Sequence, residues 1–320
     1  MVDKSKKHAH MEAEQTVSKA MQSVLRQNLA YMATWEQAAR TWDNIEGVHQ
    51  TRVAFRRLRS ALSIFRAVLP EQETKAWADG MRDLATGLGR ARDLDVFISE
   101  TLAGVRGKIP LAGASKLEAV AFEHRAQAYQ EVRAMLDSDA HVQFKQDFGY
   151  WVENRGWDQG ELSDKQRHQL ERNVIPFARK LLDRHERRVL DVGTHVDKQS
   201  QVAMHGLRIQ CKKLRYAAEF FAPLFVGMDL FINRMRGLQD LLGVLNDISL
   251  TRDLLERFQG DSSDQELNTY AGAITGWQAR QRQELLDGFE RHWEEFTEAR
   301  HPWWRKDAVH ALSGRNSSGS

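Results

Sequence analysis

The amino-acid sequence predicts an all-α protein. Apolar residues recur every three or four positions in nearly every segment, whereas the alternation typical of strands is almost absent. Only 5 prolines interrupt the 320 residues, and 42% of the residues are hydrophobic, which is enough to bury a core. We therefore expect a globular helical protein with one large domain or two domains of ordinary size.

Turn-forming residues mark the breaks between the expected helices. The second helix follows the turn sequence DNIEG and ends before Pro70. Later breaks fall at RGKIPLAG (106–113), NRGWDQGELSD (154–164) and FQGDSSD (258–264), where glycine, proline and short polar residues gather. In chain order, the expected helices span residues 11–40, 47–68, 72–103, 115–137, 140–152, 164–191, 200–222, 229–259, 263–289 and 291–300.

Both ends of the chain differ in composition from the helical part. We expect residues 1–10 and the tail 313–320 to be disordered, because neither has the apolar residues that a core requires. The break near Gly156 divides the rest into two halves, about 11–153 and 164–312.

The charges of the whole chain nearly cancel. It has 46 basic and 44 acidic residues, so an argument for an anionic partner must rest on a local cluster. The single cysteine, Cys211, excludes an intramolecular disulfide, and the first twenty residues do not resemble a secretory signal. No window of 18 apolar residues is free of charge. We expect a cytoplasmic protein without a membrane span.

The two halves share an ordered pattern of histidine and basic residues. The pattern H-x-x-R-x-x-x-[RK]-[RK]-L-R occurs twice, first as His49, Arg52, Arg56, Arg57 and Arg59, and then as His205, Arg208, Lys212, Lys213 and Arg215. A second signature follows each copy: Asp93 lies four residues after Gly89, and Asp247 lies four after Gly243. An internal duplication explains both signatures at once.

On a helix, the basic residues of each copy form a stripe. Positions 49, 52, 56 and 59 fall within an arc of roughly 80°. The apolar side chains of an adjacent arc are expected in the core, namely Phe55, Leu58, Leu62 and Phe65 in the first copy and Leu207, Cys211, Leu214 and Phe221 in the second. Like charges one turn apart repel, so either acidic side chains from other helices or a bound anion must neutralise the stripes. A single basic run is usually a solvated face, but its duplication with histidine in register favours a binding site.

Three acidic residues accompany the stripes. Asp93 and Asp247 are interpreted as structural, either as helix caps or as arginine partners. Glu219 lies on the basic line and is expected to pair with Arg215 or to close the stripe. Further basic residues that could extend the surface are Arg92, Lys180, Arg184, Arg234 and Arg236. We expect neither a metal nor a cofactor, because no second histidine or cysteine stands one turn from His49 or His205, and arginines repel cations.

The paired signatures resemble those of CHAD domains, a family named for a conserved histidine in an α-helical domain. VHQTRVAFRRLRSAL with LGRARDLDVF, and then MHGLRIQCKKLRYAAEFF with LQDLLGVLNDI, carry the resemblance, and the expected domain spans 11–312. It implies two four-helix bundles related by pseudo-twofold symmetry, with a basic groove or channel between them. It also implies a protein that binds inorganic polyphosphate through the ten residues of the two stripes, and the absence of catalytic motifs leads us to expect that it is not an enzyme. Lys212 and Lys213 replace arginines of the first copy, and they offer point charges rather than bidentate contacts.

The resemblance further implies a location on polyphosphate or polyhydroxyalkanoate granules, with granule-surface components as possible partners. Two other functions stay open. One is a polyphosphate hydrolase or transferase, although no P-loop, zincin motif or acidic two-metal cluster is present. The other is nucleic-acid binding, which the scarcity of aromatic residues in the stripes disfavours.

Overall fold

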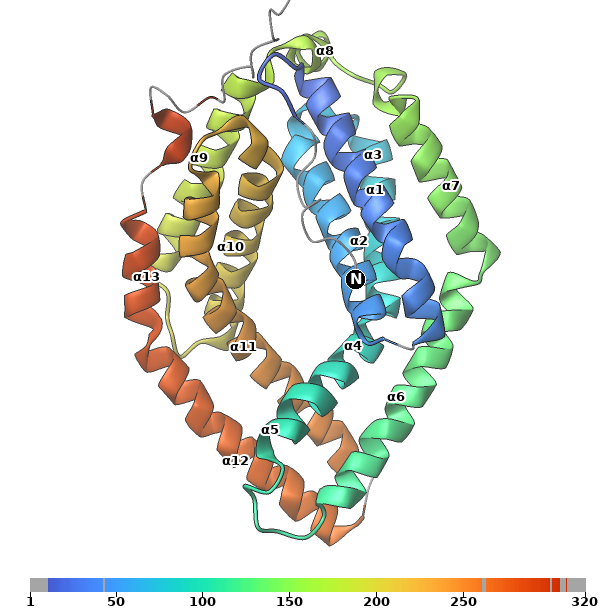
Figure 1. Cartoon of the computed structure of the whole chain (residues 1–320), viewed down its shortest axis with the longest axis vertical. Helices are drawn as coiled ribbons and strands as arrows, with labels where there is room; N and C mark the ends of the chain where they lie inside the picture. The colour runs from blue at the N-terminus through green and yellow to red at the C-terminus, as the bar shows by residue number, and fades with distance from the viewer. Residues whose placement is uncertain (1–10, 43, 261–262, 300, 306–308, 310–320) are drawn as a thin grey trace, which may run out of the picture.

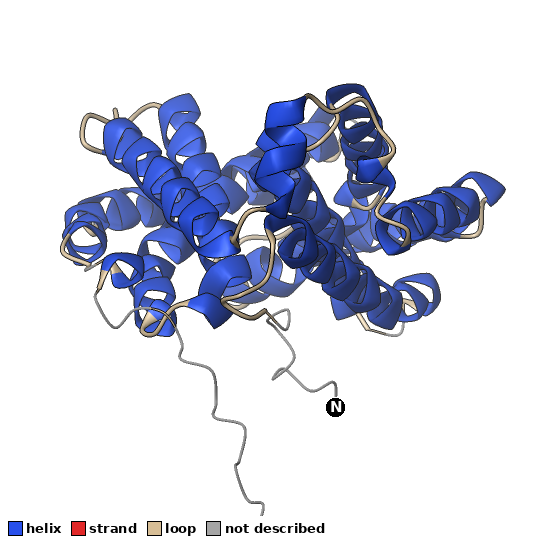
Figure 2. Ribbon diagram, turned by 90° about the horizontal axis from the view of Figure 1, so that it is seen from above, coloured by secondary structure: helices blue, strands red, loops and turns tan. Residues whose placement is uncertain are grey.

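A computed structural model of the chain describes residues 11–42, 44–260, 263–299, 301–305 and 309. The predicted all-α class is confirmed, because these residues form helices joined by loops, with two isolated β-bridges and no strand (Figure 2). The segments expected to be disordered, 1–10 and 313–320, lie outside the described residues.

The described helices follow one another with short connections. In chain order, the α-helices are α1 (Val17–Thr41), α2 (Glu46–Phe65), α3 (Glu71–Gly87), α4 (Gly89–Val96), α5 (Ala103–Val105), α6 (Ala114–Leu136), α7 (Asp139–Glu153), α8 (Asp164–Glu171), α9 (Val174–Gly193), α10 (Gln201–Phe221), α11 (Met228–Gly260), α12 (Gln265–Asp287) and α13 (Phe289–Thr297). The 3-10 turns are η1 (Arg66–Val68), η3 (Gly156–Asp158), η4 (Ala222–Leu224) and η5 (Pro302–Trp304), and η2 (Phe97–Leu102) is a π-helical segment.

Two of the expected helices are divided in the structure. The segment 72–103 breaks at Leu88, between Gly87 and Gly89, and it becomes π-helical at Phe97. The segment 164–191 breaks at residues 172–173, because their backbone bonds to the chain before α1 instead of continuing the helix. Val17 N–H donates to the carbonyl oxygen of Arg172 (2.9 Å). The first helix also begins six residues later than expected, at Val17, where Thr16 caps it.

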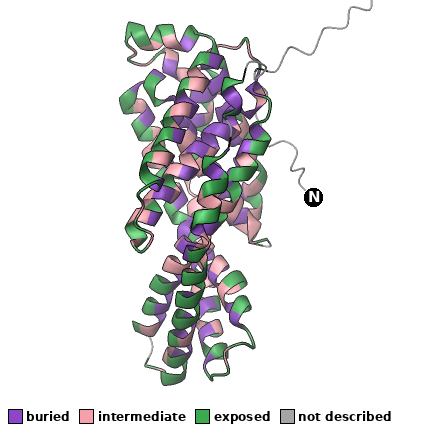
Figure 3. Ribbon diagram, turned by 90° about the vertical axis from the view of Figure 1, so that its left-hand side faces the viewer, coloured by how far each residue is buried: buried purple, intermediate pink, exposed green. Residues whose placement is uncertain are grey.

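The helices of each half pack side by side, and the two halves contact each other through several helices, among them α1 with α9 and α6 with α12. In Figure 1, α1, α2 and α3 lie together, and α9, α10 and α11 form a separate group. Helix α2 contacts α10, and the long α11 runs on to cross α4. Buried residues concentrate in the broad upper part of the molecule, whereas the lower end is mostly exposed (Figure 3).

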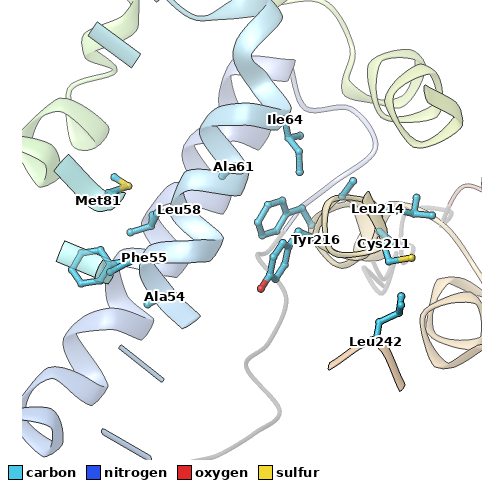
Figure 4. Close-up of a cluster of buried hydrophobic side chains, with 14 of the residues drawn as sticks. Ala54, Phe55, Leu58, Ala61, Ile64, Met81, Cys211, Leu214, Tyr216 and Leu242 are labelled. Atoms are coloured by element: carbon cyan, nitrogen blue, oxygen red, sulfur yellow. The ribbon is translucent and has the colours of Figure 1, made fainter. Parts of the chain in front are cut away.

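The core contains the residues that the sequence pattern places on the apolar arcs. Phe55, Leu58, Leu62 and Phe65 are at most 1% exposed, and so are Leu207, Cys211, Leu214 and Phe221. Figure 4 shows Phe55 and Leu58 of α2 pointing toward Met81, while Cys211 and Leu214 of α10 point away from α2. Each large apolar side chain buried in this way contributes about 1.5–3 kcal/mol. Burial of these arcs fixes which face of α2 and of α10 remains for the basic residues.

None of the described helices combines the length and the apolarity that a membrane crossing needs. The exposed large apolar residues are scattered over several helices.

Candidate functional site

The basic stripes of α2 and α10 converge where the two helices meet. Arg56 Nε donates a hydrogen bond to the hydroxyl oxygen of Tyr216 (2.5 Å). The charges of Arg56 and Arg52 both lower the pKa of Arg208, after burial, which is the largest cause. Residues that are 156 positions apart in the chain therefore share one electrostatic environment.

Three basic side chains in this environment form no ion pair with the described residues. In the part of the chain that the structure describes, no carboxylate oxygen lies within 4.0 Å of a side-chain nitrogen of Arg52, Arg208 or Lys212. All three side chains are partly buried, and Nε of Arg208 is a buried donor without a hydrogen-bond acceptor. Burial lowers the pKa of Arg52 and of Arg208, and neighbouring arginines lower both further. Among the described residues, these side chains therefore lack a directly paired carboxylate, and Asp93 and Asp247 act on them only from beyond 4.0 Å.

Lys212 shows the largest effect of this crowding. Its pKa is lowered to about 6, first by burial and then by the charges of Arg56, Arg208 and Arg215. Asp247 opposes the shift without reversing it. The amine of Lys212 is consequently mostly neutral at neutral pH when no ligand is bound.

The two histidines of the duplicated pattern differ in their surroundings. His49 is partly buried in the first turn of α2, and its pKa is lowered to about 4 by burial and by the charge of Arg92. His205 is exposed, and its Nδ1 lies 3.2 Å from Oδ1 of Asn246. The two histidines therefore hold the same position in the repeated pattern but have different surroundings.

Asp93 and Asp247 supply negative charge beside the stripes. Asp93 lies within α4 and Asp247 within α11, so the helix-cap interpretation of both residues is wrong. Burial raises the pKa of Asp93, and the nearby Asp247 raises it further, whereas Arg52 lowers it. The two carboxyl groups therefore lie near each other with Arg52 close by, although neither forms an ion pair with Arg52 within 4.0 Å in the described residues.

A second group of charged residues forms ion pairs between α2 and α10. Arg57 Nη1 forms an ion pair with Glu219 Oε2, and Arg57 Nε donates to Oδ1 of Asn28 (2.8 Å). Arg215 Nε lies 3.4 Å from Glu219 Oε1. The expected pairing of Glu219 with Arg215 is thus present, and Glu219 also reaches across to Arg57. These two arginines are already partly neutralised.

Two residues of the stripes turn away from the junction of α2 and α10. Arg59 faces α3, where burial and the charge of Arg82 lower its pKa. Lys213 lies toward α9, because its charge lowers the pKa of His185, to about 4, after the larger effect of burial.

The five residues expected to extend the surface are dispersed. Arg92 belongs to the junction, since its charge acts on His49, Arg52 and Asp93. Lys180 and Arg184 are exposed on α9. Arg236 is exposed on α11, and Arg234 lines a surface pocket with Glu295 and Glu298.

Sequence reasoning missed Tyr216. Its side chain is 2% exposed and lies between α2 and α10 (Figure 4). Its ring centroid is 5.9, 5.7 and 5.4 Å from the guanidinium carbons of Arg56, Arg57 and Arg215. Because its hydroxyl accepts from Arg56, the hydroxyl hydrogen can donate to a ligand. The spacing of four residues after Lys212 was the available signal, since it continues the stripe by one turn.

The site contains the donors that an anion requires. It presents arginine, lysine and tyrosine donors, and no group of three or more histidine, cysteine, aspartate or glutamate side chains placed to hold a metal ion occurs among the described residues. The arrangement can neutralise a multiply charged anion lying between α2 and α10.

Comparisons with known proteins agree with this picture. The family model of the CHAD domain matches residues 23–256. The chain belongs to the CHAD domain family. CHAD domains are known as polyphosphate-binding domains that are in general non-catalytic.

Two solved structures are similar to this CHAD protein in fold. The crystal structure of the CHAD domain from the plant Ricinus communis aligns with a TM-score of 0.78 at 24% identity, covering 91% of this chain and 95% of that one. PptA from Streptomyces chartreusis aligns with a TM-score of 0.68 at 13% identity, covering 88% of this chain and 100% of that one. No curated protein matches the chain.

Proposed function

We propose that this CHAD protein binds inorganic polyphosphate at the junction of α2 and α10. The observation that carries the proposal is the set of partly buried basic side chains that form no ion pair with a described carboxylate, Arg52, Arg208 and Lys212. Gathering like charges in a low-dielectric site is unfavourable unless a ligand neutralises them. Inorganic polyphosphate, the ligand class of the family, supplies negative charge at every unit.

The chemistry of the ligand suits helical stripes. Polyphosphate has no base or sugar to recognise, so a receptor needs repeated donors on a rigid frame. At 1.5 Å per residue, positions 49 to 59 of α2 extend over roughly 15 Å, and α10 supplies donors from the opposite side. Guanidinium groups can hold two phosphate oxygens each, and release of condensed counterions contributes much of the binding free energy.

The proposed contacts are a subset of the ten stripe residues, with one addition. Arg52, Arg56, Arg208, Lys212 and the hydroxyl of Tyr216 would touch phosphate oxygens, with His49 and Arg92 beside them. Arg57 and Arg215 would position α2 against α10 through Glu219. His205, Arg59 and Lys213 would lie along the path that the polymer follows away from the junction.

The proposal includes an internal duplication that forms two related helical bundles around a basic groove. Two parallels support it. Helix α2 ends at Phe65 and α10 at Phe221, and each is followed at once by a three-residue 3-10 turn. In both halves, an aspartate four residues after a glycine lies near Arg52.

Binding of the polymer would carry the protein to polyphosphate granules. A fluorescent fusion is expected to collect on these granules and to disperse when Arg52 and Arg208 are both changed to glutamine. Collection on polyhydroxyalkanoate granules, or retention of the double variant on polyphosphate granules, would show that another surface directs the protein.

The function is tested by calorimetric titration of the purified protein with medium-chain polyphosphate. We expect tight binding that Arg52→Gln/Arg208→Gln weakens by at least about 100-fold, because each charge-assisted contact contributes about 1.5–3 kcal/mol. The matched control is Arg187→Gln/Arg291→Gln, which removes two exposed arginines and should change the affinity little.

Two further readouts separate the alternatives. Single-stranded RNA at equal phosphate concentration should compete weakly, and equal competition would favour a nucleic-acid-binding protein. Release of inorganic phosphate on incubation with a divalent metal would instead favour a hydrolase. Absence of polyphosphate binding by the wild type contradicts the proposal.

A further inference from the structure

An arginine-rich pocket opens beside the proposed site. It has a volume of about 420 Å³ and lies among α2, α3, α4 and α11. Its charged lining consists of Arg52, Arg59, Arg82, Arg90, Arg257 and Asp93. Arg82, Arg90 and Arg257 belong to neither basic stripe, so the duplicated pattern does not account for them.

The pocket carries an excess of positive charge after its ion pairs are considered. Arg82 pairs with Asp79, and Arg90 pairs with Glu131, both at 2.9 Å. In the described part of the chain, no carboxylate oxygen lies within 4.0 Å of the side-chain nitrogens of Arg52, Arg59 or Arg257. Among the residues that line the pocket, Asp93 alone sets a negative charge against these three arginines, while Asp247 acts on Arg52, and Asp79 and Asp83 act on Arg59, from outside the lining.

Arg52 joins the pocket to the junction of α2 and α10. It lines the pocket, and its charge also lowers the pKa of Arg208 on α10. Gly89 lies beside Arg52 at the break between α3 and α4. A Cβ at Gly89 would lie 3.8 Å from Nη2 of Arg52. Arg52 is therefore shared by the pocket and the junction of α2 and α10.

The charge of the pocket suits one particular part of the polymer. An interior unit of polyphosphate has one negative charge and two non-bridging oxygens. A terminal unit has up to two negative charges and three such oxygens, like a phosphate monoester. We propose that this pocket binds the terminal phosphate group of polyphosphate, with Arg257 as a direct contact. This inference rests on the proposed function, and it adds that the protein recognises chain ends.

The test compares three ligands in the same titration. They are long polyphosphate with free ends, polyphosphate of the same length with its ends capped as phosphoramidates, and tripolyphosphate. Capping removes one negative charge from each end and leaves the interior unchanged. The wild type is expected to bind the free-ended polymer about tenfold or more tightly than the capped one, as for the loss of one charge-assisted contact.

The variant Arg257→Gln assigns this preference to the pocket. The variant is expected to bind free-ended polymer no more tightly than capped polymer, and to bind tripolyphosphate about tenfold more weakly than the wild type does. Its affinity for the capped polymer should stay within about twofold of the wild-type affinity. The control is Arg252→Gln on the same helix, which makes the same change of charge. Arg252 is not part of the pocket lining and lies 3.8 Å from Glu256, so its variant should keep the preference.

Each outcome has a distinct meaning. Equal affinity of the wild type for capped and free-ended polymer overturns end recognition while leaving polyphosphate binding intact. A preference that survives Arg257→Gln overturns the assignment to this pocket. If free inorganic phosphate displaces tripolyphosphate at equal concentration, the pocket binds any phosphate dianion and the chain-end assignment is wrong. Failure to bind any of the three ligands contradicts the proposed function itself.

Discussion

Binding of polyphosphate should be accompanied by proton uptake at Lys212. The pKa of Lys212 is about 6 in the free protein, so at pH 7.5 roughly 3% of the molecules carry the charge. A polyanion favours the charged amine and should return the pKa toward its ordinary value of 10.5. We therefore expect close to one proton to be taken up per site at pH 7.5.

The same shift sets the pH dependence of affinity. Protonating Lys212 at pH 7.5 costs about 2 kcal/mol, since each pKa unit corresponds to about 1.4 kcal/mol, and this cost weakens binding by about 30-fold. The bound state holds more protons than the free state, so affinity falls as pH rises, by about tenfold per unit between pH 7 and pH 9. His49 contributes little here, because even an ordinary histidine pKa of 6.5 leaves it mostly neutral above pH 7.5.

Calorimetry in two buffers of different ionisation enthalpy measures the proton uptake directly. The Lys212→Arg variant, whose side chain stays charged throughout this range, should take up no proton at that site and should bind with an affinity that changes little from pH 7 to pH 9. Titration of the terminal phosphates of the ligand contributes equally to the measurements on both proteins, so the variant also controls for it. If wild type and Lys212→Arg have parallel pH profiles and equal proton uptake, the reasoning about Lys212 is refuted.

Three further predictions concern the same helices. Lys212→Met should raise the free energy of urea unfolding at pH 7 by several kcal/mol, because the lowered pKa of Lys212 destabilises the folded chain by about 1.4 kcal/mol for each pH unit from 10.5 down to 6. The gain should be under about 1 kcal/mol at pH 10, and an equal gain at both pH values would contradict this. Tyr216→Phe should weaken polyphosphate binding about tenfold with little change in unfolding free energy, and an unchanged dissociation constant would remove Tyr216 from the site. Gly47→Ala should destabilise the protein by about 3 kcal/mol or more, because the added Cβ would lie 2.3 Å from a backbone atom of Ala38. The control Gly272→Ala, whose Cβ would have no atom within 4 Å, should be neutral or stabilising. Similar melting temperatures for the two variants would show that α1 and α2 can shift.

The periodicity of apolar residues was sufficient to predict the helices and their buried faces. Phe55 and Cys211 occupy the core positions that the spacing assigns to them, because helical geometry fixes which residues share a face. The breaks at Leu88 and at residue 172 were not predictable in the same way. The first lies between two glycines, Gly87 and Gly89, which helices often tolerate, and the second depends on hydrogen bonds to a segment far away in the sequence.

For the candidate site, the pattern indicated which residue types matter but not how each is used. Arg57 and Lys213 occupy the same position of the repeat, yet Arg57 pairs with Glu219 and Lys213 lies toward α9. Their roles depend on which helices surround them, and a single helical pattern does not contain that information. Tyr216 escaped notice for a related reason, since a tyrosine becomes part of a basic site only when guanidinium groups from another helix reach it.

The most direct test of the account is the salt dependence of polyphosphate binding for wild type and Arg208→Gln. If Arg208 contacts phosphate, the plot of log affinity against log salt concentration should be steep for the wild type, and its slope should become shallower by about 0.7–1 in the variant. Parallel lines of equal slope would mean that Arg208 does not neutralise a phosphate, and that the unpaired cations between α2 and α10 are not the binding site.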